Sequence, residues 1–247
     1  MDGSGFTIIL VIGSYLLAGL VKGVMGMGLP QVSLGILASV MTPAQAAAIL
    51  IAPSFATNVW QMVTGPHLVG LLRRLAGMLI GLFIGAWLGA GILTGANAKP
   101  ASVGLGIVLI VYAVLGLAKV KFVVPRHTEF WLGPIIGLAT GYVMAATGVF
   151  VMPALPYLQA IGLEKEELVQ ALGLHFTMST VALSLVLWNG GAFDASLGWL
   201  SLLAIIPALI GMYAGQHIRR RISVETFRKC FFTGIVVIGL QLVWRNL

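Results

Sequence analysis

Long apolar stretches recur along the whole chain and are separated by short polar or glycine-rich segments. An α-helix needs about 20 mainly apolar residues to cross the hydrocarbon core of a bilayer. The pattern therefore predicts full membrane crossings in six segments: Ala44–Val63, Leu75–Leu93, Pro100–Ala118, Leu168–Trp188, Ser196–Gly215 and Val224–Trp244.

Two further apolar regions, Phe6–Met41 and Phe130–Ile161, are too long for one helix, and glycine and proline divide each into two short halves. A half of about 12–15 residues rises only about 18–22 Å, which is less than a hydrocarbon core about 30 Å thick. The sequence thus predicts an all-α polytopic membrane protein with about ten helical pieces. Eight to ten of these pieces are membrane segments, and four of them are short.

The composition agrees with a lipid environment. Only 9% of the 247 residues are charged and the mean hydropathy is +1.04, whereas soluble domains have about 25% charged residues. The first residues lack a basic segment and a small-residue cleavage site, so we expect no cleavable signal peptide. The single cysteine, Cys230, lies in an apolar stretch and argues against disulfides or a cysteine metal site.

Basic residues are concentrated in three of the polar segments: Leu71–Arg74, Lys119–Arg126 and His217–Arg221. Lys and Arg favour the cytoplasmic side of a membrane. This pattern predicts that the three segments are cytoplasmic loops and that both termini lie outside. The net charge of +7 then reflects orientation in the membrane, and we expect no nucleic-acid partner.

The two halves of the chain resemble each other weakly in sequence. The matching segments, in the same order in both halves, are Gly19–Gly23 with Gly137–Gly141, Ile49–Asn58 with Gln170–Ser179, and Gly85–Gly89 with Gly211–Gly215. The basic loop at Arg73 corresponds to the segment 189–194, which has no basic residue. Since matching loops differ in charge, the pattern predicts an inverted-topology repeat of residues 1–122 and 123–247, as in many secondary transporters.

Each half contains a glycine-rich break between two short helices, at Lys22–Pro30 and at Ala146–Pro153. Unwound backbone at membrane depth is tolerated where protein buries it or water reaches it. Helices that begin near Pro30 and Val151 would direct their N-terminal N–H groups inward and form an anion site. Lys22 would add a positive charge there. The alternative for Lys22 is that its side chain extends along the lipid to the interface.

Polar residues on the matching helices complete the predicted site. Asn58 and His175 are costly to bury and are the favoured site residues, although the hydroxyl residues could equally serve helix packing. Glycines at every fourth position, Gly77, Gly81, Gly85 and Gly89, are assigned to close helix packing. The predicted substrate-binding residues are Lys22, Gly26, Gly28, Gln31, Thr57, Asn58, Gln61, Thr147, Gly148, His175 and Ser179.

No catalytic motif is found in the sequence: HExxH, GxSxG, Walker A and paired intramembrane carboxylates are all absent. The four histidines do not cluster at metal-ligand spacing. These absences argue against a membrane hydrolase, an ATP-driven pump and a carboxylate-based proton symporter or cation channel. We therefore expect no enzymatic activity, no cofactor and no metal.

The segments Gly19–Leu37 and Met41–Gly65 resemble the first half of the TauE/SafE proteins, the sulfite exporter family of bacterial permeases. Ala146–Leu158 is similar to the second motif of that family. The resemblance implies a multi-pass permease of the bacterial cytoplasmic membrane that exports sulfite, a sulfonate or another small organosulfur anion. Thr147 and Gly148 stand where a fuller glycine cluster is common, so an asymmetric pair of motifs is expected.

Two other functions stay open at the level of sequence. One is a channel-like anion pore, and the other is a membrane scaffold or enzyme partner that transports nothing. For a transporter, the absence of buried carboxylates leaves two energy sources: the membrane potential, through electrogenic uniport, or proton coupling through His175, which is able to titrate near neutral pH.

Overall fold

The computed structural model describes residues 3–95, 98–118, 123–192, 195–219 and 224–246, and these residues are helical apart from short connections. They form eleven α-helices and one 3₁₀ turn, η1 (Arg126–Thr128). The α-helices are α1 (Gly3–Met25), α2 (Leu29–Leu37), α3 (Pro43–Val63), α4 (Leu68–Leu88), α5 (Ala98–Ala118), α6 (Glu129–Thr147), α7 (Ala154–Ala160), α8 (Lys165–Asn189), α9 (Ala195–Leu203), α10 (Ile205–Ile218) and α11 (Val224–Asn246).

Eight helical segments of the described residues are long and apolar enough to cross a membrane. They include all six predicted crossings, with α9 and α10 forming one segment around Ala204, and α1 and α6 add two more. The chain is therefore a multi-pass membrane protein.

The prediction of four short halves is wrong for α1 and α6. Helix α1 has 23 residues and rises about 35 Å, so it is long enough to cross the bilayer. Its glycines do not end it, because Gly19 and Gly23 pack directly against the backbone of α10. Only the second half of each pair is short, with 9 residues in α2 and 7 in α7.

Helix α4 also differs from its prediction, since it begins at Leu68 and not at Leu75. The predicted basic loop at Leu71–Arg74 is therefore part of a helix. Long basic side chains at a helix end reach the interface without breaking the helix. A prediction that treats basic residues as a loop therefore places the start of α4 too late in the chain. Of the other two predicted loops, residues 119–122 and 220–221 lie outside the described residues.

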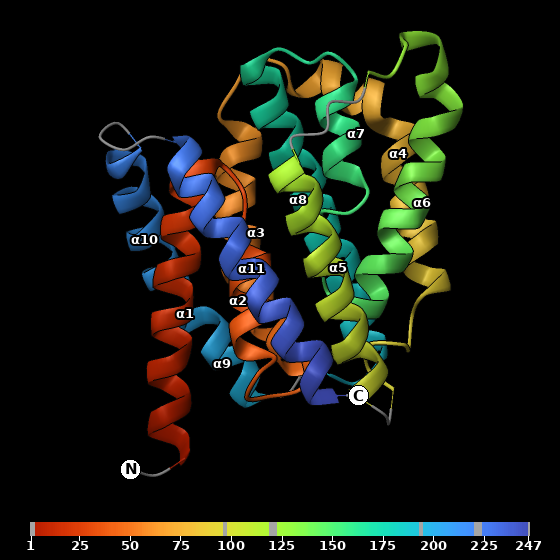
Figure 1. Ribbon diagram of the computed structural model, residues 1–247. Coiled ribbons are helices and arrows are strands. Elements are labelled where there is room, and N and C mark those ends of the chain that lie inside the picture. The colour runs from red at the N-terminus through yellow and green to blue at the C-terminus, as the bar shows by residue number, and fades with distance from the viewer. Residues whose placement is uncertain (1–2, 96–97, 119–122, 193–194, 220–223, 247) are drawn as a thin grey trace.

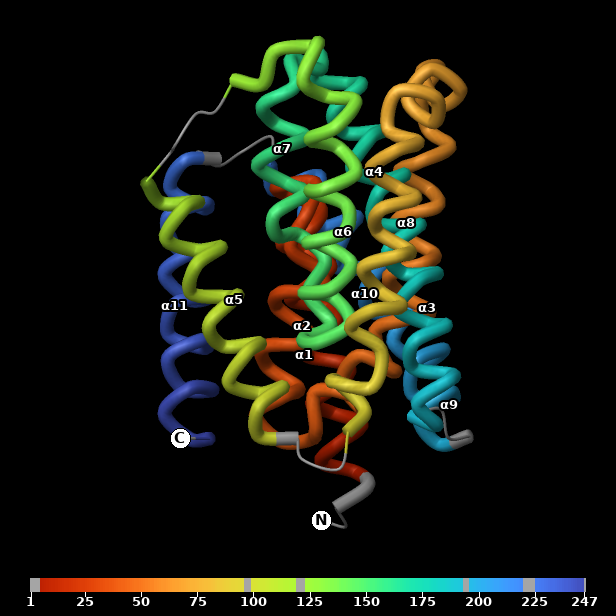
Figure 2. The backbone as a smooth tube through the Cα atoms, turned by 90° about the vertical axis from the view of Figure 1, so that its right-hand side faces the viewer, coloured from red at the N-terminus to blue at the C-terminus, as the bar shows by residue number. Residues whose placement is uncertain are grey.

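Both termini lie at the lower end of the molecule in Figures 1 and 2. Helix α1 begins at this end and α2 returns to it, whereas α6 begins at the upper end and α7 returns there (Figure 1). The long helices pack in pairs, α1 with α10, α4 with α6, α5 with α11 and α3 with α8. Figure 2 shows the α5–α11 pair along one side of the molecule.

Glycines allow two of these pairs to approach at backbone distance. A Cβ atom added to Gly85 on α4 would lie 2.0 Å from the carbonyl oxygen of Leu138 on α6. On α10, a Cβ at Gly211 would lie 2.1 Å from the carbonyl oxygen of Leu16 on α1. The assignment of the α4 glycine ladder to helix packing is thus confirmed.

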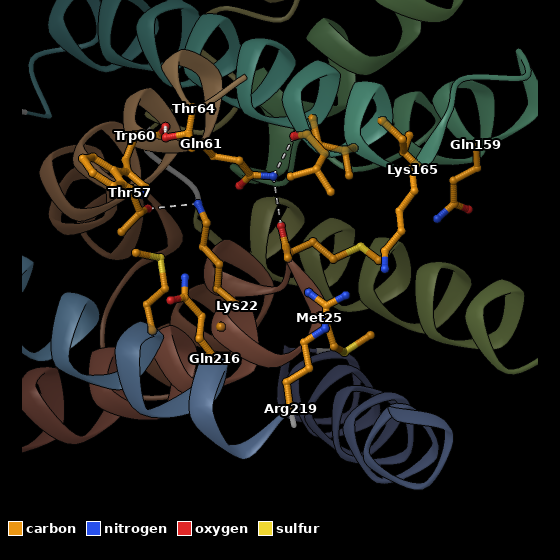
Figure 3. Close-up of a pocket in the computed structure, with 17 residues that line it drawn as sticks. Lys22, Met25, Thr57, Trp60, Gln61, Thr64, Gln159, Lys165, Gln216 and Arg219 are labelled. Atoms are coloured by element: carbon orange, nitrogen blue, oxygen red, sulfur yellow. Dashed lines mark hydrogen bonds between the residues drawn. The ribbon is translucent and has the colours of Figure 1, made fainter. Parts of the chain in front are cut away.

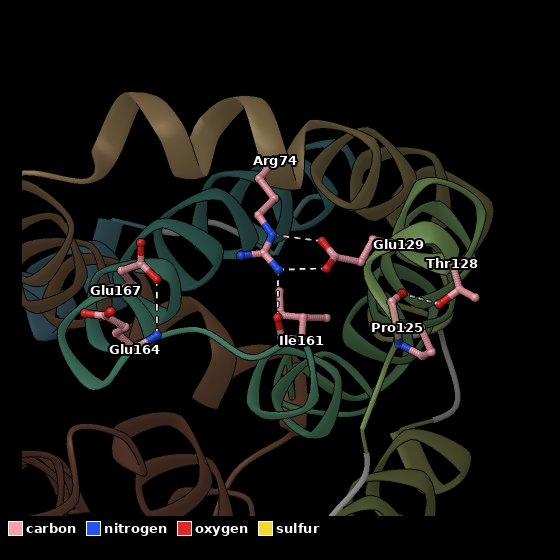
Figure 4. A network of polar contacts seen from close by, with 7 residues as sticks. All are labelled: Arg74, Pro125, Thr128, Glu129, Ile161, Glu164 and Glu167. Atoms are coloured by element: carbon pink, nitrogen blue, oxygen red, sulfur yellow. Dashed lines mark hydrogen bonds and ion pairs between the residues drawn. The ribbon is translucent and has the colours of Figure 1, made fainter.

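A bidentate ion pair ties α4 to the start of α6 (Figure 4). Arg74 donates from Nε and Nη2 to the Glu129 carboxylate at 2.8 and 2.7 Å, and Nη2 also donates to the Ile161 carbonyl oxygen at 2.7 Å. The pair is largely shielded from solvent. It therefore joins α4, α6 and the end of α7 at the end of the molecule where the basic residues lie.

We expect Arg74→Met to lower the free energy of unfolding by about 1–3 kcal/mol, because charge-assisted hydrogen bonds have this strength and Glu129 loses its partner. Arg73→Met is the matched control, since Arg73 is exposed and contacts no partner among the described residues. Thermal unfolding in detergent measures the difference. Equal melting temperatures for the two variants would contradict a structural role for the pair.

Candidate functional site

A cavity of about 690 Å³ opens between α1, α3, α8 and α10. Its volume lies within the range of about 300–1,000 Å³ that is usual for small-molecule sites. Eight polar side chains that line it are labelled in Figure 3: Lys22, Thr57, Gln61, Thr64, Gln159, Lys165, Gln216 and Arg219. Three of these side chains are basic, and the lining residues include no carboxylate. The cavity therefore has the charge of an anion site.

Lys22, in the last turn of α1, forms the inner end of the cavity and is only 4% exposed. Its Nζ atom donates to Thr57 Oγ1 at 3.0 Å and to Asn58 Oδ1. The side chain thus turns toward α3 and does not extend along the lipid to the surface.

Helix α3 presents these acceptors because of its local sequence. It begins at a capping box in which Thr42 and Gln45 bond each other's backbone, and Pro53 lies inside the helix. Thr57 Oγ1 donates to the Pro53 carbonyl oxygen at 2.8 Å, and Asn58 Nδ2 donates to Ser54 Oγ at 2.9 Å. Both hydroxyl and amide therefore direct an oxygen lone pair toward Lys22.

The first glycine break forms one wall of the cavity. Gly26 ends α1 with a φ of 78° and donates its N–H to the Lys22 carbonyl oxygen at 2.7 Å. Gly28 precedes α2 with a φ of 110°, and Pro30 occupies the first turn as predicted. Gln61 Nε2 lies 3.4 Å from the Gly26 carbonyl oxygen and donates to Val169 O at 2.9 Å. The break is thereby tied to α3 and α8.

The second break lies in a separate, fully buried group. Gly148 ends α6 with a φ of 78°, and α7 begins at Ala154, three residues after the predicted Val151. His175 is completely buried, and its Nε2 lies 2.9 Å from the Phe150 carbonyl oxygen. Since a carbonyl only accepts, Nε2 carries the ring proton.

The structure divides the predicted site residues into two groups. Lys22, Gly26, Thr57 and Gln61 line the cavity, and Asn58 bonds Lys22 directly. Around His175, Ser179 Oγ lies 3.5 Å from Nε2, and Thr147 Oγ1 accepts from Val149 N. The second group, with Gly148, does not line the cavity.

The two remaining predicted residues, Gly28 and Gln31, also lie outside the cavity lining. Gln31 is completely buried in the first turns of α2. Its side-chain oxygen and nitrogen have no hydrogen-bond partner among the described residues. A Cβ atom added to Gly28 would lie 2.6 Å from Val21 Cγ1 and 3.4 Å from Phe231 Cζ.

Sequence reasoning missed five polar cavity residues: Thr64, Gln159, Lys165, Gln216 and Arg219. Lys165 stands among glutamates and reads as a solvated helix start, and Arg219 was counted only toward membrane orientation. Gln216 could have been predicted as a site residue, because it is a polar residue in an apolar helix. For metals, the described residues contain no group of three His, Cys, Asp or Glu side chains placed to hold an ion.

A family model described as "Sulfite exporter TauE/SafE" matches residues 11–242 of the chain. No curated protein and no solved structure matches the chain. The matched range includes all of the cavity residues, from Lys22 to Arg219.

Proposed function

Because the chain belongs to the TauE/SafE sulfite exporter family, whose members are membrane transporters and not enzymes, we propose that it exports a small sulfur-containing anion as a secondary transporter. Sulfite and organosulfonates such as isethionate are the proposed substrates. The observation that carries this proposal is the cavity at Lys22, which has three basic side chains and no carboxylate among its lining residues.

The cavity suits an anion with several oxygen atoms. A sulfite or sulfonate group accepts hydrogen bonds at three oxygens, and the lining supplies lysine, arginine, amide and hydroxyl donors. A cleft lined by charges of one sign within low-dielectric walls also concentrates ions of the opposite sign. The basic residues Arg73, Arg126 and Arg219 lie in or next to the ends of α4, α6 and α10, and these ends are at the upper end of Figure 1. This arrangement supports an opening toward the cytoplasm and both termini outside.

The packing of glycines supports the proposed inverted repeat of residues 1–122 and 123–247. Each contact between α1 and α10 has a counterpart between α6 and α4. The Gly19–Ala208 contact corresponds to Gly137–Met78, and the Gly23–Met212 contact corresponds to Gly141–Leu82. In the same way, the Gly211–Leu16 contact corresponds to Gly81–Pro134. These pairs favour Gly81–Gly85 as the counterpart of Gly211–Gly215, one helical turn before the match made from sequence.

In the proposed architecture, α1–α2 and α6–α7 are broken-helix pairs, each a long helix followed by a short one, that start from opposite sides of the membrane, as their directions in Figure 1 suggest. Helices α2 and α7 rise only about 10–14 Å, so neither is long enough to cross the bilayer alone. Broken helices at the interface between inverted repeats are the usual position of transporter substrate sites.

A transporter that alternates between two states is favoured over an open pore. Beyond Lys22 the polar groups bond one another, with Asn58 donating to Ser54 and the Ser54 hydroxyl 3.1 Å from that of Thr180. Both hydroxyl residues are at most 1% exposed. The cavity therefore ends at Lys22, as expected for a site open to one side only.

Flux through purified protein in liposomes tests the proposed function. We expect saturable movement of at least one anion among sulfite, sulfoacetate, isethionate and taurine, without ATP. Flux that rises linearly with concentration would favour the channel-like pore, and no flux of any of the four would favour the non-transporting scaffold.

The outer cations of the cavity are expected to recruit the anion. Lys165→Gln should raise KM about 3–10-fold and change kcat less than about 2-fold, because a charge at the rim mainly affects encounter. Arg73→Gln is the control, since it removes an exposed cation at the same end of the molecule but outside the cavity. Equal KM values for the two variants would contradict the role of Lys165.

The first glycine break should be sensitive to side chains. In Gly28→Val, a residue with a φ of 110° gains a Cβ that would lie 2.6 Å from Val21 Cγ1, so the break must shift and flux should fall at least about 10-fold. Gly91→Val is the control, because Gly91 has a φ of 91° and no atom within 4 Å of an added Cβ. Normal flux in Gly28→Val would remove the break from the mechanism.

A further inference from the structure

The described residues provide hydrogen-bond acceptors for two N–H bonds of Lys22 Nζ. Nζ has two acceptors among the described residues, Thr57 Oγ1 and Asn58 Oδ1. A neutral amine has two N–H bonds, whereas the ammonium form has three. The protein thus satisfies the neutral amine fully. The third N–H of the charged form has no acceptor there, while the side chain lines the cavity.

No carboxylate of the neighbouring helices neutralises Lys22. The helices that pack against α1 are α2, α9, α10 and α11, and α3 supplies the two acceptors. Among their described residues, only Glu225 on α11 is acidic, and it is exposed and outside the cavity lining. The other titratable or charged side chains on these helices are Tyr213, His217, Arg219, Arg228, Lys229, Cys230 and Arg245.

The two other cations of the cavity, Lys165 and Arg219, repel a charge on Lys22. A buried charge without a partner is costly, and a counter-charge at hydrogen-bond distance removes most of that cost. The residues that line the cavity supply no such counter-charge. An anion that enters it does, and its oxygen is also the missing acceptor for the third N–H.

We propose that Lys22 takes up one proton each time an anion binds and loses it when the anion leaves, so that the protein carries anion and proton together. An N–H bond forms at Nζ with a proton from water on the binding side, and the same bond breaks on release at the other side. A monoanion then crosses with no net charge. This inference rests on the proposed function and assigns its coupling ion.

His175 is the less suitable proton carrier. Its Nε2–H is used by the Phe150 carbonyl oxygen, and its ring does not line the cavity. The structure thus assigns the coupling proton to a lysine, which sequence reasoning had considered only as a fixed charge.

Isethionate is the probe of choice because its sulfonate stays ionised, so any proton taken up belongs to the protein. Calorimetric titration in two buffers of different ionisation enthalpy measures the protons bound per anion. We expect about one for the wild type and none for Lys22→Arg, because a guanidinium keeps the charge and does not deprotonate. Where isethionate does not bind, sulfite replaces it, with its own ionisation subtracted from a protein-free control.

Flux in liposomes gives an independent measurement. For the coupled mechanism, a potential of 100 mV should change the equilibrium accumulation less than about 2-fold, whereas uniport of a monoanion predicts about 50-fold. A pH difference of one unit should change accumulation about 10-fold. Potential-driven accumulation without proton uptake, or one proton per anion in Lys22→Arg, would overturn the inference while leaving transport intact. Absence of binding and flux for every anion would overturn the proposed function and this inference with it.

Discussion

Lys22→Met is expected to reduce anion flux about 100-fold, the largest loss for any single side chain of the cavity. The substitution keeps the length and apolar stem of the side chain but removes the cation at the inner end. Hydrogen bonds to a charged group contribute about 1.5–3 kcal/mol each, and 1.4 kcal/mol corresponds to a factor of ten in binding. Loss of the ammonium and its direct contact with the anion accounts for the expected factor.

The main effect should be on anion binding. Lys22→Met also removes the donor to Thr57 Oγ1 and Asn58 Oδ1, which should lower the free energy of unfolding by about 1–3 kcal/mol and still leave folded protein for the assay. Lys165→Gln, with its smaller expected effect on KM, gives the comparison within the same cavity. A Lys22→Met protein that transports at the wild-type rate would contradict the assignment of the site.

The second large effect is expected at the glycine contacts between helix pairs. Gly85→Leu and Gly211→Leu should both reduce the yield of folded protein below about one tenth of the wild type. The added Cβ atoms would lie 2.0 and 2.1 Å from carbonyl oxygens, and a backbone cannot move aside as a flexible side chain does. Overfilling a packed interface typically costs about 1–3 kcal/mol and occasionally more, and here two whole helices must separate.

Gly13→Leu is the matched control, since Gly13 lies in α1 and an added Cβ has no neighbour within 4 Å. Size-exclusion chromatography of detergent extracts measures the folded fraction of all three variants. Because the glycine contacts between α4 and α6 correspond to those between α10 and α1 in the proposed inverted repeat, the losses in the two variants should be similar. A folded Gly211→Leu protein beside an unfolded Gly85→Leu protein would contradict that equivalence.

The sequence predicted six of the eight candidate spans correctly because apolar length is a local property. The prediction is wrong at places where tertiary contacts determine where a helix begins or ends. The first half of Phe6–Met41 was predicted to be a short helix, yet the backbone of α10 packs against Gly19 and Gly23 and α1 extends over Gly3–Met25. Arg74 read as a loop residue, yet its partner Glu129, far away in sequence, holds it within a helix.

The candidate site was only partly predictable for a similar reason. Lys22 is recognisable because no other charged residue occurs between Gly3 and Leu72, and the polar turn at Thr57 and Asn58 is visible in an apolar helix. Lys165 and Arg219 enter the cavity from the ends of α8 and α10. No sequence pattern relates those ends to α1, because the packing of the helices brings them together.

The role of the Lys22 cavity in anion transport is tested most directly by radiolabelled sulfite counterflow in liposomes that contain purified protein. Vesicles loaded with unlabelled sulfite should accumulate the label transiently in the wild type, and excess isethionate should compete. Lys22→Met vesicles with the same amount of folded protein should accumulate the label at no more than about one hundredth of that rate. Accumulation at equal rates in both preparations would show that the anion does not pass through the Lys22 cavity.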